Sequence, residues 1–181
     1  MERFEKDAKN VVIDTNVIFS AMVKENGFVR GFLIFIKNVE KLNIFIPKLL
    51  LREIRMNKRY IARKTGITED RLNSIFRELL KGMVIVDEKE FLEEIEMCMK
   101  SGVAHRGDIV FAALAIKKRP SILFTYNLKH YNKEHLLKLD VNVITPRQYM
   151  RERRTSIEYT SREKLRRNMM KFLRILKFKK K

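Results

Sequence analysis

Four oxygen-bearing side chains in this 181-residue sequence stand where together they could bind a divalent cation. Asp14 follows the apolar run of residues 11–13, Glu53 lies early in a helical stretch, Asp108 opens another, and Asn127 follows a further apolar run. Carboxylates that lie close together repel one another, so such a cluster usually persists because a cation neutralises it. Hard oxygen ligands without cysteine or histidine favour Mg²⁺ or Mn²⁺ over zinc. Such ions activate water for the hydrolysis of phosphodiester bonds.

Each of these residues also has an ordinary structural explanation. Asp14 or Asn16 could cap the helix that follows, and Asp108 could cap its own, because Asp and Asn stabilise a helix N-terminus by about 1 kcal/mol. Glu53, in "LLLREIRMNKR", could be an exposed helical acid paired with Arg or Lys neighbours. Asn127, in "TYNLKH", could be a turn residue. Taken singly, these residues do not decide between structure and chemistry.

The elements that would position these side chains alternate along the chain. Apolar runs typical of buried strands are Val11–Ile13, Ile44–Ile46, Met83–Val86, Ile122–Phe124 and Val141–Ile144. Stretches with helical spacing are Val17–Lys37, Lys48–Arg55, Asp70–Leu80, Lys89–Lys100 and Asp108–Lys118. Between the second and third strands we expect two helical segments, with Gly66 ending the first and Thr68 capping the second. The alternation predicts an α/β fold with a mainly parallel sheet of about five strands and helices on both faces.

Such a fold gives the four side chains a reason to meet. In an open parallel sheet, ligands bind beyond the carboxyl ends of the strands, at the point where the strand order reverses. Asp14 and Asn127 come just after strands, while Glu53 and Asp108 lie on the first turns of helices. We therefore expect all four at one edge of the sheet.

The charge of the chain indicates its partner. A formal net charge of +18 far exceeds what solubility requires. Each Lys or Arg that neutralises a phosphate releases a counterion, so nucleic acid is the first expectation and an anionic membrane the second. Basic surroundings would also offset the repulsion between an acidic pocket and RNA.

Membrane insertion and disulfide chemistry are not expected. No apolar run approaches the roughly 18 residues of a membrane span. The N-terminal stretch "MERFEKDAKN" is charged where a signal peptide would be apolar, so we expect a cytoplasmic protein with no membrane partner. Cys98 is the only cysteine, which excludes an internal disulfide and a cysteine-based zinc site and favours an inert core residue.

Residues 147–181 form a distinct basic segment. They contain fourteen Lys or Arg and three Glu, a net charge of +11. Apolar residues follow helical spacing, which predicts a basic amphipathic helix. The candidate RNA-binding residues on its charged faces are Arg166, Arg167, Lys171 and Arg174. The alternatives are a helix docked on the domain with a merely solvated charged face, or a helix for a membrane or a protein partner.

Three stretches together resemble the PIN domain family, the nuclease fold of VapC-type toxins and of many RNA-processing proteins. "VVIDTNVIFSAM" is similar to the opening motif, a strand ending in Asp followed by Ser or Thr and Asn. "IPKLLLREI" resembles the second motif, a Pro after the strand and a helical Glu. "HRGDIVFAALAIKKRPSILFTYNLKHY" resembles the third and fourth motifs together. The resemblance spans roughly Val11 to Pro146.

The resemblance implies a three-layer α/β/α sandwich over residues 1–146, followed by a basic C-terminal helical extension over residues 147–181. It implies that Asp14, Glu53 and Asp108 bind Mg²⁺ or Mn²⁺. It also implies that three polar neighbours shape the pocket through hydrogen bonds, namely Thr15, Asn16 and Thr125.

The fourth motif departs from the family pattern. Many members carry an acid where this sequence has Asn127 or His130, and Tyr131 matches the aromatic position that follows. Asn127 can bind a metal through its amide oxygen without adding negative charge, so a second metal would bind more weakly. His105 either faces the same edge or is a surface loop residue, whereas His130 and His135 are expected at the surface.

The expected function is that of a metal-dependent endoribonuclease, either a toxin or an RNA-processing enzyme. The alternative is a catalytically weak PIN module that binds RNA or assembles a complex. A phosphatase built on a strand-end Asp is a third reading, which the absence of a second Asp at Asn16 disfavours. The resemblance further implies a homodimer and, for a toxin, an antitoxin partner.

Overall fold

A computed structural model describes residues 9–23 and 27–154 of the chain, and its centre is a five-stranded sheet. The strands are β1 (Asn10–Ile13), β2 (Asn43–Pro47), β3 (Val84–Val86), β4 (Ser121–Phe124) and β5 (Val141–Ile144). Their order is β3-β2-β1-β4-β5, and every neighbouring pair is parallel. The predicted α/β fold with a parallel, five-stranded sheet is confirmed.

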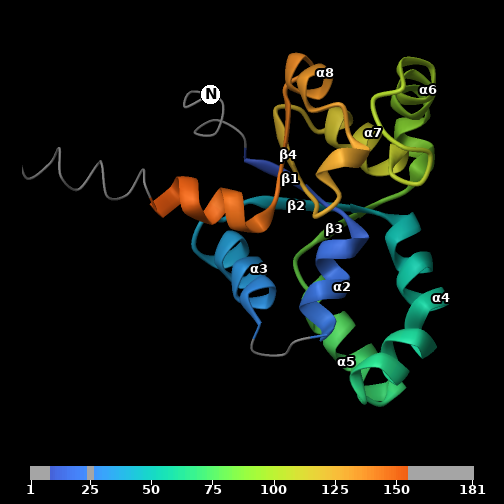
Figure 1. Ribbon diagram of the computed structural model, residues 1–181, viewed down its shortest axis with the longest axis vertical. Coiled ribbons are helices and arrows are strands. Elements are labelled where there is room, and N and C mark those ends of the chain that lie inside the picture. Colours follow the sequence, from blue (N-terminus) through green and yellow to red (C-terminus); the bar gives the residue numbers. More distant parts are fainter. Residues whose placement is uncertain (1–8, 24–26, 155–181) are drawn as a thin grey trace, which may run out of the picture. The chain divides into compact units, whose positions relative to one another are not determined.

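Helices cover both faces of the sheet, as in the predicted three-layer sandwich (Figure 1). On one side lie α2 (Thr15–Val23), α3 (Phe28–Asn38), α4 (Lys48–Thr65) and α5 (Glu69–Leu80). On the other lie α6 (Leu92–Ser101), α7 (Ile109–Lys117) and α8 (Lys133–Lys138). Two short 3₁₀ helices, η1 (Glu88–Phe91) and η2 (Leu128–His130), precede α6 and α8.

The described residues fall into two units, divided between residues 146 and 147. In the second unit residues 147–154 are helical. The predicted basic helix and its candidate RNA-binding residues Arg166, Arg167, Lys171 and Arg174 lie outside the described residues. The roles assigned to residues 1–146 and 147–181 stay predictions. None of the helices within the described ranges combines the length and the apolar character that crossing a membrane requires.

The predicted helix over residues 17–37 is wrong as a single element. The structure has two helices there, and Gly27 precedes the second with extended backbone angles of φ −82° and ψ 154°. Glycine is among the weakest helix formers, so a helix tends to be interrupted where it occurs. The helix predicted over residues 48–55 instead continues as α4 to Thr65.

The core of the sandwich is the contact between α7 and the centre of the sheet. Seven of the nine residues of α7 are buried, and β4 is buried along its whole length. Three of those buried residues, Ala112, Ala113 and Ala115, are small enough to let the helix approach the strands closely. This continuous burial explains why the central strands appear in the sequence as uninterrupted apolar runs.

The link between α4 and α5 is formed as expected. Gly66 ends α4 in the left-handed conformation, with φ +71°. Thr68 caps α5, since its side chain accepts a hydrogen bond from the backbone N–H of Arg71. The sharp turn at Gly66 lets α4 and α5 pack against each other on one face of the sheet.

Replacing either of two glycines with alanine should change the free energy of unfolding in opposite directions, although a Cβ has open space at both positions. A Cβ at Gly66 or at Gly31, inside α3, would meet no atom within 4 Å. At Gly66 the left-handed backbone disfavours alanine, so Gly66→Ala should lower the free energy of unfolding by about 1 kcal/mol. Gly31→Ala should raise it by up to about 1 kcal/mol, because alanine is the better helix former. Urea unfolding measures both, and a change of the same sign in the two variants would contradict this account.

Candidate active site

The site lies at the carboxyl edge of the sheet, between β1 and β4. Chain connections leave these two neighbouring strands in opposite directions along the sheet, so the strand order reverses there. The backbone N–H of Asp14 donates to the carbonyl of Phe124 at 3.0 Å, which keeps the strands paired up to that edge. This is where ligands bind in open parallel sheets.

Asp14 is buried at this edge, with 3% of its surface exposed. Its Oδ2 accepts hydrogen bonds from the hydroxyls of Thr125 (2.7 Å) and Tyr131 (3.3 Å) and from the side-chain amide of Asn16 (2.8 Å). Burial raises its pKa above the ordinary value, the charge of Asp108 adds to the rise, and the hydrogen bonds act against it. The carboxylate is therefore held by donors from three separate segments.

The capping explanation of Asp14 holds alongside this arrangement. Asp14 immediately precedes α2, and its Oδ1 accepts a hydrogen bond from the backbone N–H of Asn16 at 3.3 Å. The distance is long for a hydrogen bond, while the contacts to Oδ2 include shorter ones. The side chain thus serves the helix start and faces the edge of the sheet at once.

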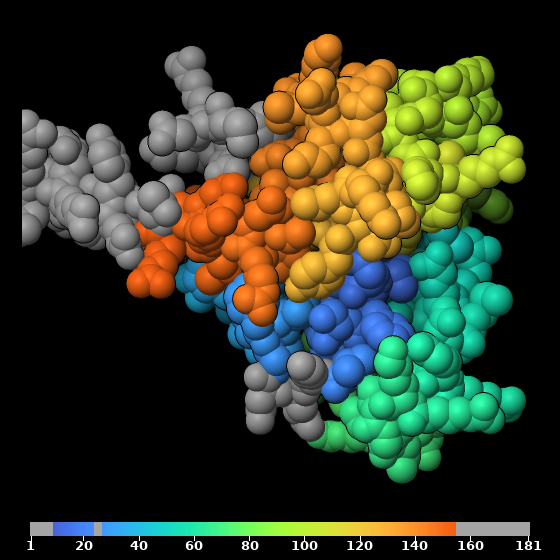
Figure 2. Space-filling view, in the orientation of Figure 1, coloured from blue at the N-terminus to red at the C-terminus, as the bar shows by residue number. Residues whose placement is uncertain are grey.

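Asn16 connects the start of α2 to the end of β4. Its amide nitrogen donates to Asp14 and to the hydroxyl of Thr125 (3.1 Å), and its amide oxygen accepts from the backbone N–H of Tyr126 (3.0 Å). The segment after β4 accordingly borders α2 on the surface (Figure 2). Asn16 therefore fixes the strand end that Asp14 faces.

Glu53 reaches the same edge from α4. It is half-buried, and its Oε2 accepts a hydrogen bond from the hydroxyl of Thr15. Burial raises its pKa, and the charges of Asp14 and Asp108 raise it further. Within the described residues it forms no ion pair, so the alternative explanation, an exposed helical acid paired with Arg or Lys, does not hold there.

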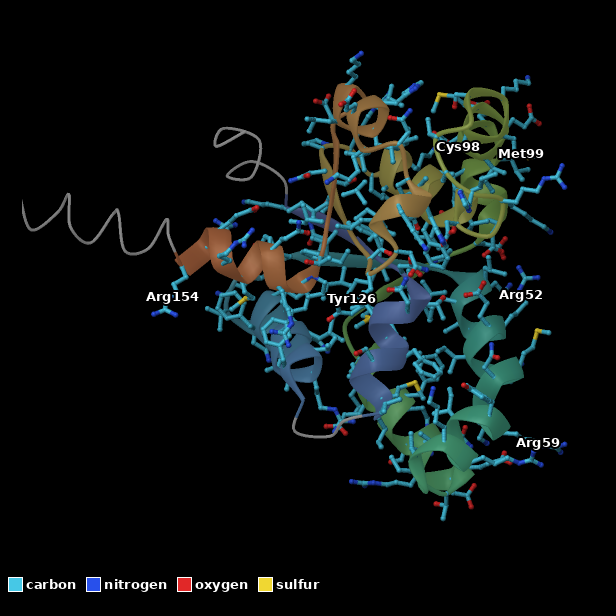
Figure 3. All side chains as sticks on the ribbon, in the orientation of Figure 1. Arg52, Arg59, Cys98, Met99, Tyr126 and Arg154 are labelled. Carbon is cyan, nitrogen blue, oxygen red and sulfur yellow. The ribbon has the colours of Figure 1, made fainter. Side chains whose placement is uncertain are left out.

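Glu88, which the sequence did not point to, binds the start of α4, the helix that carries Glu53. Pro47, the residue before α4, has no side chain that can cap the helix. Instead, Glu88 of η1 accepts a hydrogen bond from the backbone N–H of Leu49 and pairs with Arg52 at 3.2 Å. In Figure 3, Arg52 on α4 and Tyr126 after β4 lie on either side of the start of α2.

Asp108 stands at the N-cap position of α7 but does not cap it through its side chain. Its Oδ2 lies 2.9 Å from Nδ1 of His130, whose ring in turn stacks on that of His105. His130 was expected at the surface, yet 27% of its side chain is exposed and it contacts a predicted site residue. The expectation was wrong. Two segments that are distant in sequence pair with each other and bring the imidazole of His130 to Asp108.

Asn127 lies at the same edge and is held through its backbone. Its N–H donates to the hydroxyl of Thr125 at 2.9 Å, and its carbonyl accepts from the N–H of His130 at 2.9 Å. Its side chain makes no hydrogen bond within the described residues. The backbone behaves as the turn explanation predicts, and the amide stays available to a ligand.

The chemistry of this set of oxygens fits a hard divalent cation. Asp14, Glu53 and Asp108 act on one another electrostatically, so a cation among them would relieve their repulsion. Oε1 of Glu53 and Oδ1 of Asp108 accept no hydrogen bond from the described residues. However, no three His, Cys, Asp or Glu side chains of the described ranges form a ready-made ligand group. The three acids form an acidic rim at this edge of the sheet. Their role as metal ligands stays a prediction.

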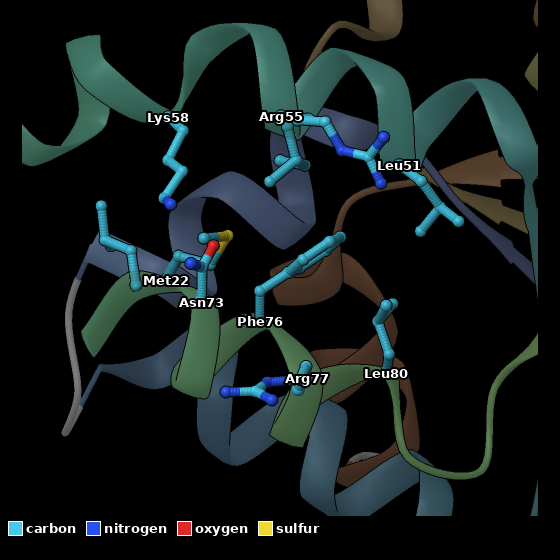
Figure 4. A pocket seen from close by; sticks show the side chains of 10 residues that line it. Met22, Leu51, Arg55, Lys58, Asn73, Phe76, Arg77 and Leu80 are labelled. Atoms are coloured by element: carbon cyan, nitrogen blue, oxygen red, sulfur yellow. The ribbon is translucent and has the colours of Figure 1, made fainter. Parts of the chain in front are cut away.

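A separate cavity of about 600 Å³ lies between α2, α4 and α5. Leu51, Ile54, Leu72 and Phe76 contribute apolar walls. Its basic residues are Arg55 and Lys58 from α4 and Arg77 from α5, as Figure 4 shows. The cavity and the acidic rim both draw on α2 and α4 but have no residue in common.

Cys98, on α6, is a buried core residue, and its expected inertness stays a prediction. It is fully buried, and burial raises the pKa of its thiol to about 11. The thiolate that would act as a nucleophile is therefore scarce at neutral pH.

Comparisons with known proteins support the fold described above. A family model described as "PIN domain" matches residues 12–125. The solved structure of VapBC2 from Rickettsia felis, bound to a DNA fragment from their promoter, aligns with a TM-score of 0.53 and 17% identity, over 74% of this chain and 98% of that chain. This likeness shows the fold. A search of curated proteins finds no significant match.

Two further solved structures align less closely. VapBC-1 from nontypeable Haemophilus influenzae has a TM-score of 0.48 and 14% identity, over 76% of this chain and 98% of that chain. FitAcB from Neisseria gonorrhoeae has a TM-score of 0.47 and 19% identity, over 75% of this chain and 97% of that chain.

The raised pKa of Glu53 predicts a stability that depends on pH. A raised pKa means that the folded state binds the proton more tightly than the unfolded state, so stability falls as pH rises above the ordinary glutamate value. In EDTA near pH 7, Glu53→Gln should therefore have a larger free energy of unfolding than the wild type. This difference should shrink toward about pH 4. Glu78→Gln, on the exposed face of α5, is the control and should change stability by less than about 0.5 kcal/mol. A gain that is independent of pH would contradict the prediction.

Proposed function

Because this chain belongs to the PIN domain family, we propose that it is a metal-dependent endoribonuclease that hydrolyses RNA phosphodiester bonds, of the toxin or RNA-processing type. The observation that carries the proposal is the electrostatic coupling of Asp14, Glu53 and Asp108 at the point where the strand order reverses. Oxygen ligands of this kind suit Mg²⁺ or Mn²⁺. The family is generally one of nucleases that depend on a divalent metal.

In this proposal Asp14, Glu53, Asp108 and Asn127 hold the ion. When bound, it supplies an activated water and stabilises the charge that develops on the leaving oxygen. The residues around these ligands hold them in position. Thr125, Asn16 and Tyr131 fix Asp14, Thr15 fixes Glu53, and His130 fixes Asp108.

Support for RNA as the substrate comes from charge. The chain carries a net charge of +18, and the acidic rim is a small region within it. Lys and Arg around the rim would attract the phosphates that three carboxylates by themselves would repel. We also propose that Arg166, Arg167, Lys171 and Arg174 contact RNA.

A second candidate function is a catalytically weak module that binds RNA or assembles a complex. Asn127 favours it, because it supplies no charge where many family members carry an acid. The arrangement of the acids also favours it, since within the described residues they form no ready-made ligand group. In this case RNA binding would depend on residues 147–181 and would not require Asp14.

The decisive experiment is Asp14→Asn in an RNA cleavage assay. With Mn²⁺ or Mg²⁺ and single-stranded RNA, the wild type should cleave, and the variant should lose at least about 100-fold in rate, because a charged metal ligand is lost. Asp70→Asn, the same change on the exposed start of α5, should cleave at the wild-type rate. Undiminished cleavage by Asp14→Asn would refute the nuclease proposal.

The same assay separates the two candidate functions. Absence of cleavage with every divalent metal, together with RNA binding that survives Asp14→Asn and disappears on deletion of residues 147–181, would favour the binding module. Cleavage that requires both the metal and Asp14 would favour the nuclease.

We further propose an acidic polypeptide partner of the antitoxin type for the cavity between α2, α4 and α5. VapBC2, whose fold the chain shares, is a complex in its solved structure. Apolar walls rimmed by Arg55, Lys58 and Arg77 suit an amphipathic segment that carries Glu or Asp. Arg55 and Arg77 form no ion pair with other described residues. The homodimer that the family resemblance implies stays a prediction.

Charge reversal tests this surface. A fluorescent synthetic helix with leucines on one face and glutamates on the other should bind the wild type. Arg77→Glu should weaken its binding roughly tenfold or more, because like charges then face each other. Arg59→Glu is the control, since Arg59 is 88% exposed on α4 and does not line the cavity. Equal weakening by both variants would show attraction to the overall positive charge and would refute the cavity as the docking surface.

A further inference from the structure

Two of the three histidines of the chain lie face to face beside the acidic rim. The ring centroids of His105 and His130 are 4.5 Å apart, and the ring planes are within 5° of parallel. This is the offset-stacked arrangement that aromatic rings favour. The contact uses one face of each ring.

The stacked pair is fixed in place by its neighbours. Segments 103–105 and 130–132 are joined by an antiparallel bridge between Ala104 and Tyr131. The backbone N–H of His105 also donates to the carbonyl of His130 at 2.9 Å. Asp108 contributes at both ends, since its carboxylate holds Nδ1 of His130 at 2.9 Å and its N–H donates to the carbonyl of His105 at 2.8 Å. Little conformational entropy would therefore be lost when a ligand binds to this pair.

The outer side of the pair is open to a ligand. His105 is exposed, and one face of its ring stacks on that of His130. Arg106 and Lys129, the sequence neighbours of the two histidines, are exposed and form no ion pair in the described part of the chain. A flat ring next to two cations suits a ligand that combines a planar base with a phosphate.

We propose that the ring of His105, backed by His130, is a stacking site for a nucleobase of single-stranded RNA. The inference rests on the proposed function, because Asp108 belongs both to the stack and to the acidic rim, so the base would lie beside the phosphate that the rim receives. Every base has a flat face, so the site accepts different sequences. It requires an unpaired nucleotide, since bases within a duplex already stack on one another.

Binding in EDTA tests this site without cleavage. Full-length protein is titrated into a short single-stranded RNA that carries one 2-aminopurine, placed at each position in turn. His105→Ala should bind roughly 5- to 150-fold more weakly and lose the fluorescence quenching at one position. His105→Phe, which keeps a flat ring, should bind within about twofold of the wild type, and so should the control His135→Ala, which changes a histidine of α8.

An abasic nucleotide completes the test. At the quenched position, its introduction should weaken binding to the wild type and leave binding to His105→Ala unchanged, because the two changes remove the same contact. The slope of log affinity against log salt should stay the same in His105→Ala, since stacking releases no counterions. A lower slope, or equal weakening in His105→Phe and His105→Ala, would indicate a phosphate contact and overturn the stacking site. Failure of the wild type to bind this RNA would overturn it as well.

The readout is independent of the nuclease proposal. If His105→Ala and the abasic nucleotide give the expected results and none of the divalent metals supports cleavage, the base site is retained and the nuclease proposal is rejected. Cleavage that depends on Asp14 together with unchanged RNA binding in His105→Ala would do the reverse.

Discussion

The buried carboxylate of Asp14 is the constraint on which the whole edge of the sheet depends. Burial and the charge of Asp108 disfavour its charged form, and specific hydrogen bonds act against that effect. Those bonds come from Asn16 on α2, Thr125 after β4 and Tyr131 after η2. One charge therefore requires the start of α2 and the stretch 125–131, which are far apart in sequence, to keep fixed positions.

The sheet order makes this convergence possible. β1 lies at the centre, with β2 on one side and β4 on the other, so the chain approaches the end of β1 from both directions. Glu53 arrives from the β2 side on α4, while Asp108 and His130 arrive from the β4 side. The charges of Asp14 and Asp108 raise the pKa of Glu53, and a cation that binds the folded rim and not the unfolded chain would also stabilise the fold by mass action. The proposed metal binding would thus be coupled to folding at this edge.

Much of this arrangement could be predicted from the sequence, and the failures have identifiable causes. The strands were predictable because buried parallel strands are continuous apolar runs, and the positions of Asp14 and Glu53 followed from the topology. The division of residues 17–37 into two helices was missed because Met22, Val29 and Ile36 recur every seven residues, a spacing compatible with one helix. The contact of His130 with Asp108 was missed because it depends on pairing between segments 103–105 and 130–132, which no local pattern reveals.

The opposite charges of the rim and of the whole chain act over different distances. At physiological salt, interactions between exposed charges fade over about 8 Å, so an approaching polyanion meets the nearest Lys and Arg before it meets the acids. The acids lie deeper, where Asp14 is almost fully buried and screening is weaker. In the proposed function they would therefore attract a small cation without reversing the attraction of the basic surface for a longer polyanion. In the proposed nuclease, Asn127 in place of an acid would keep the negative potential of the rim lower, which would favour the approach of a phosphate and weaken the binding of a second cation.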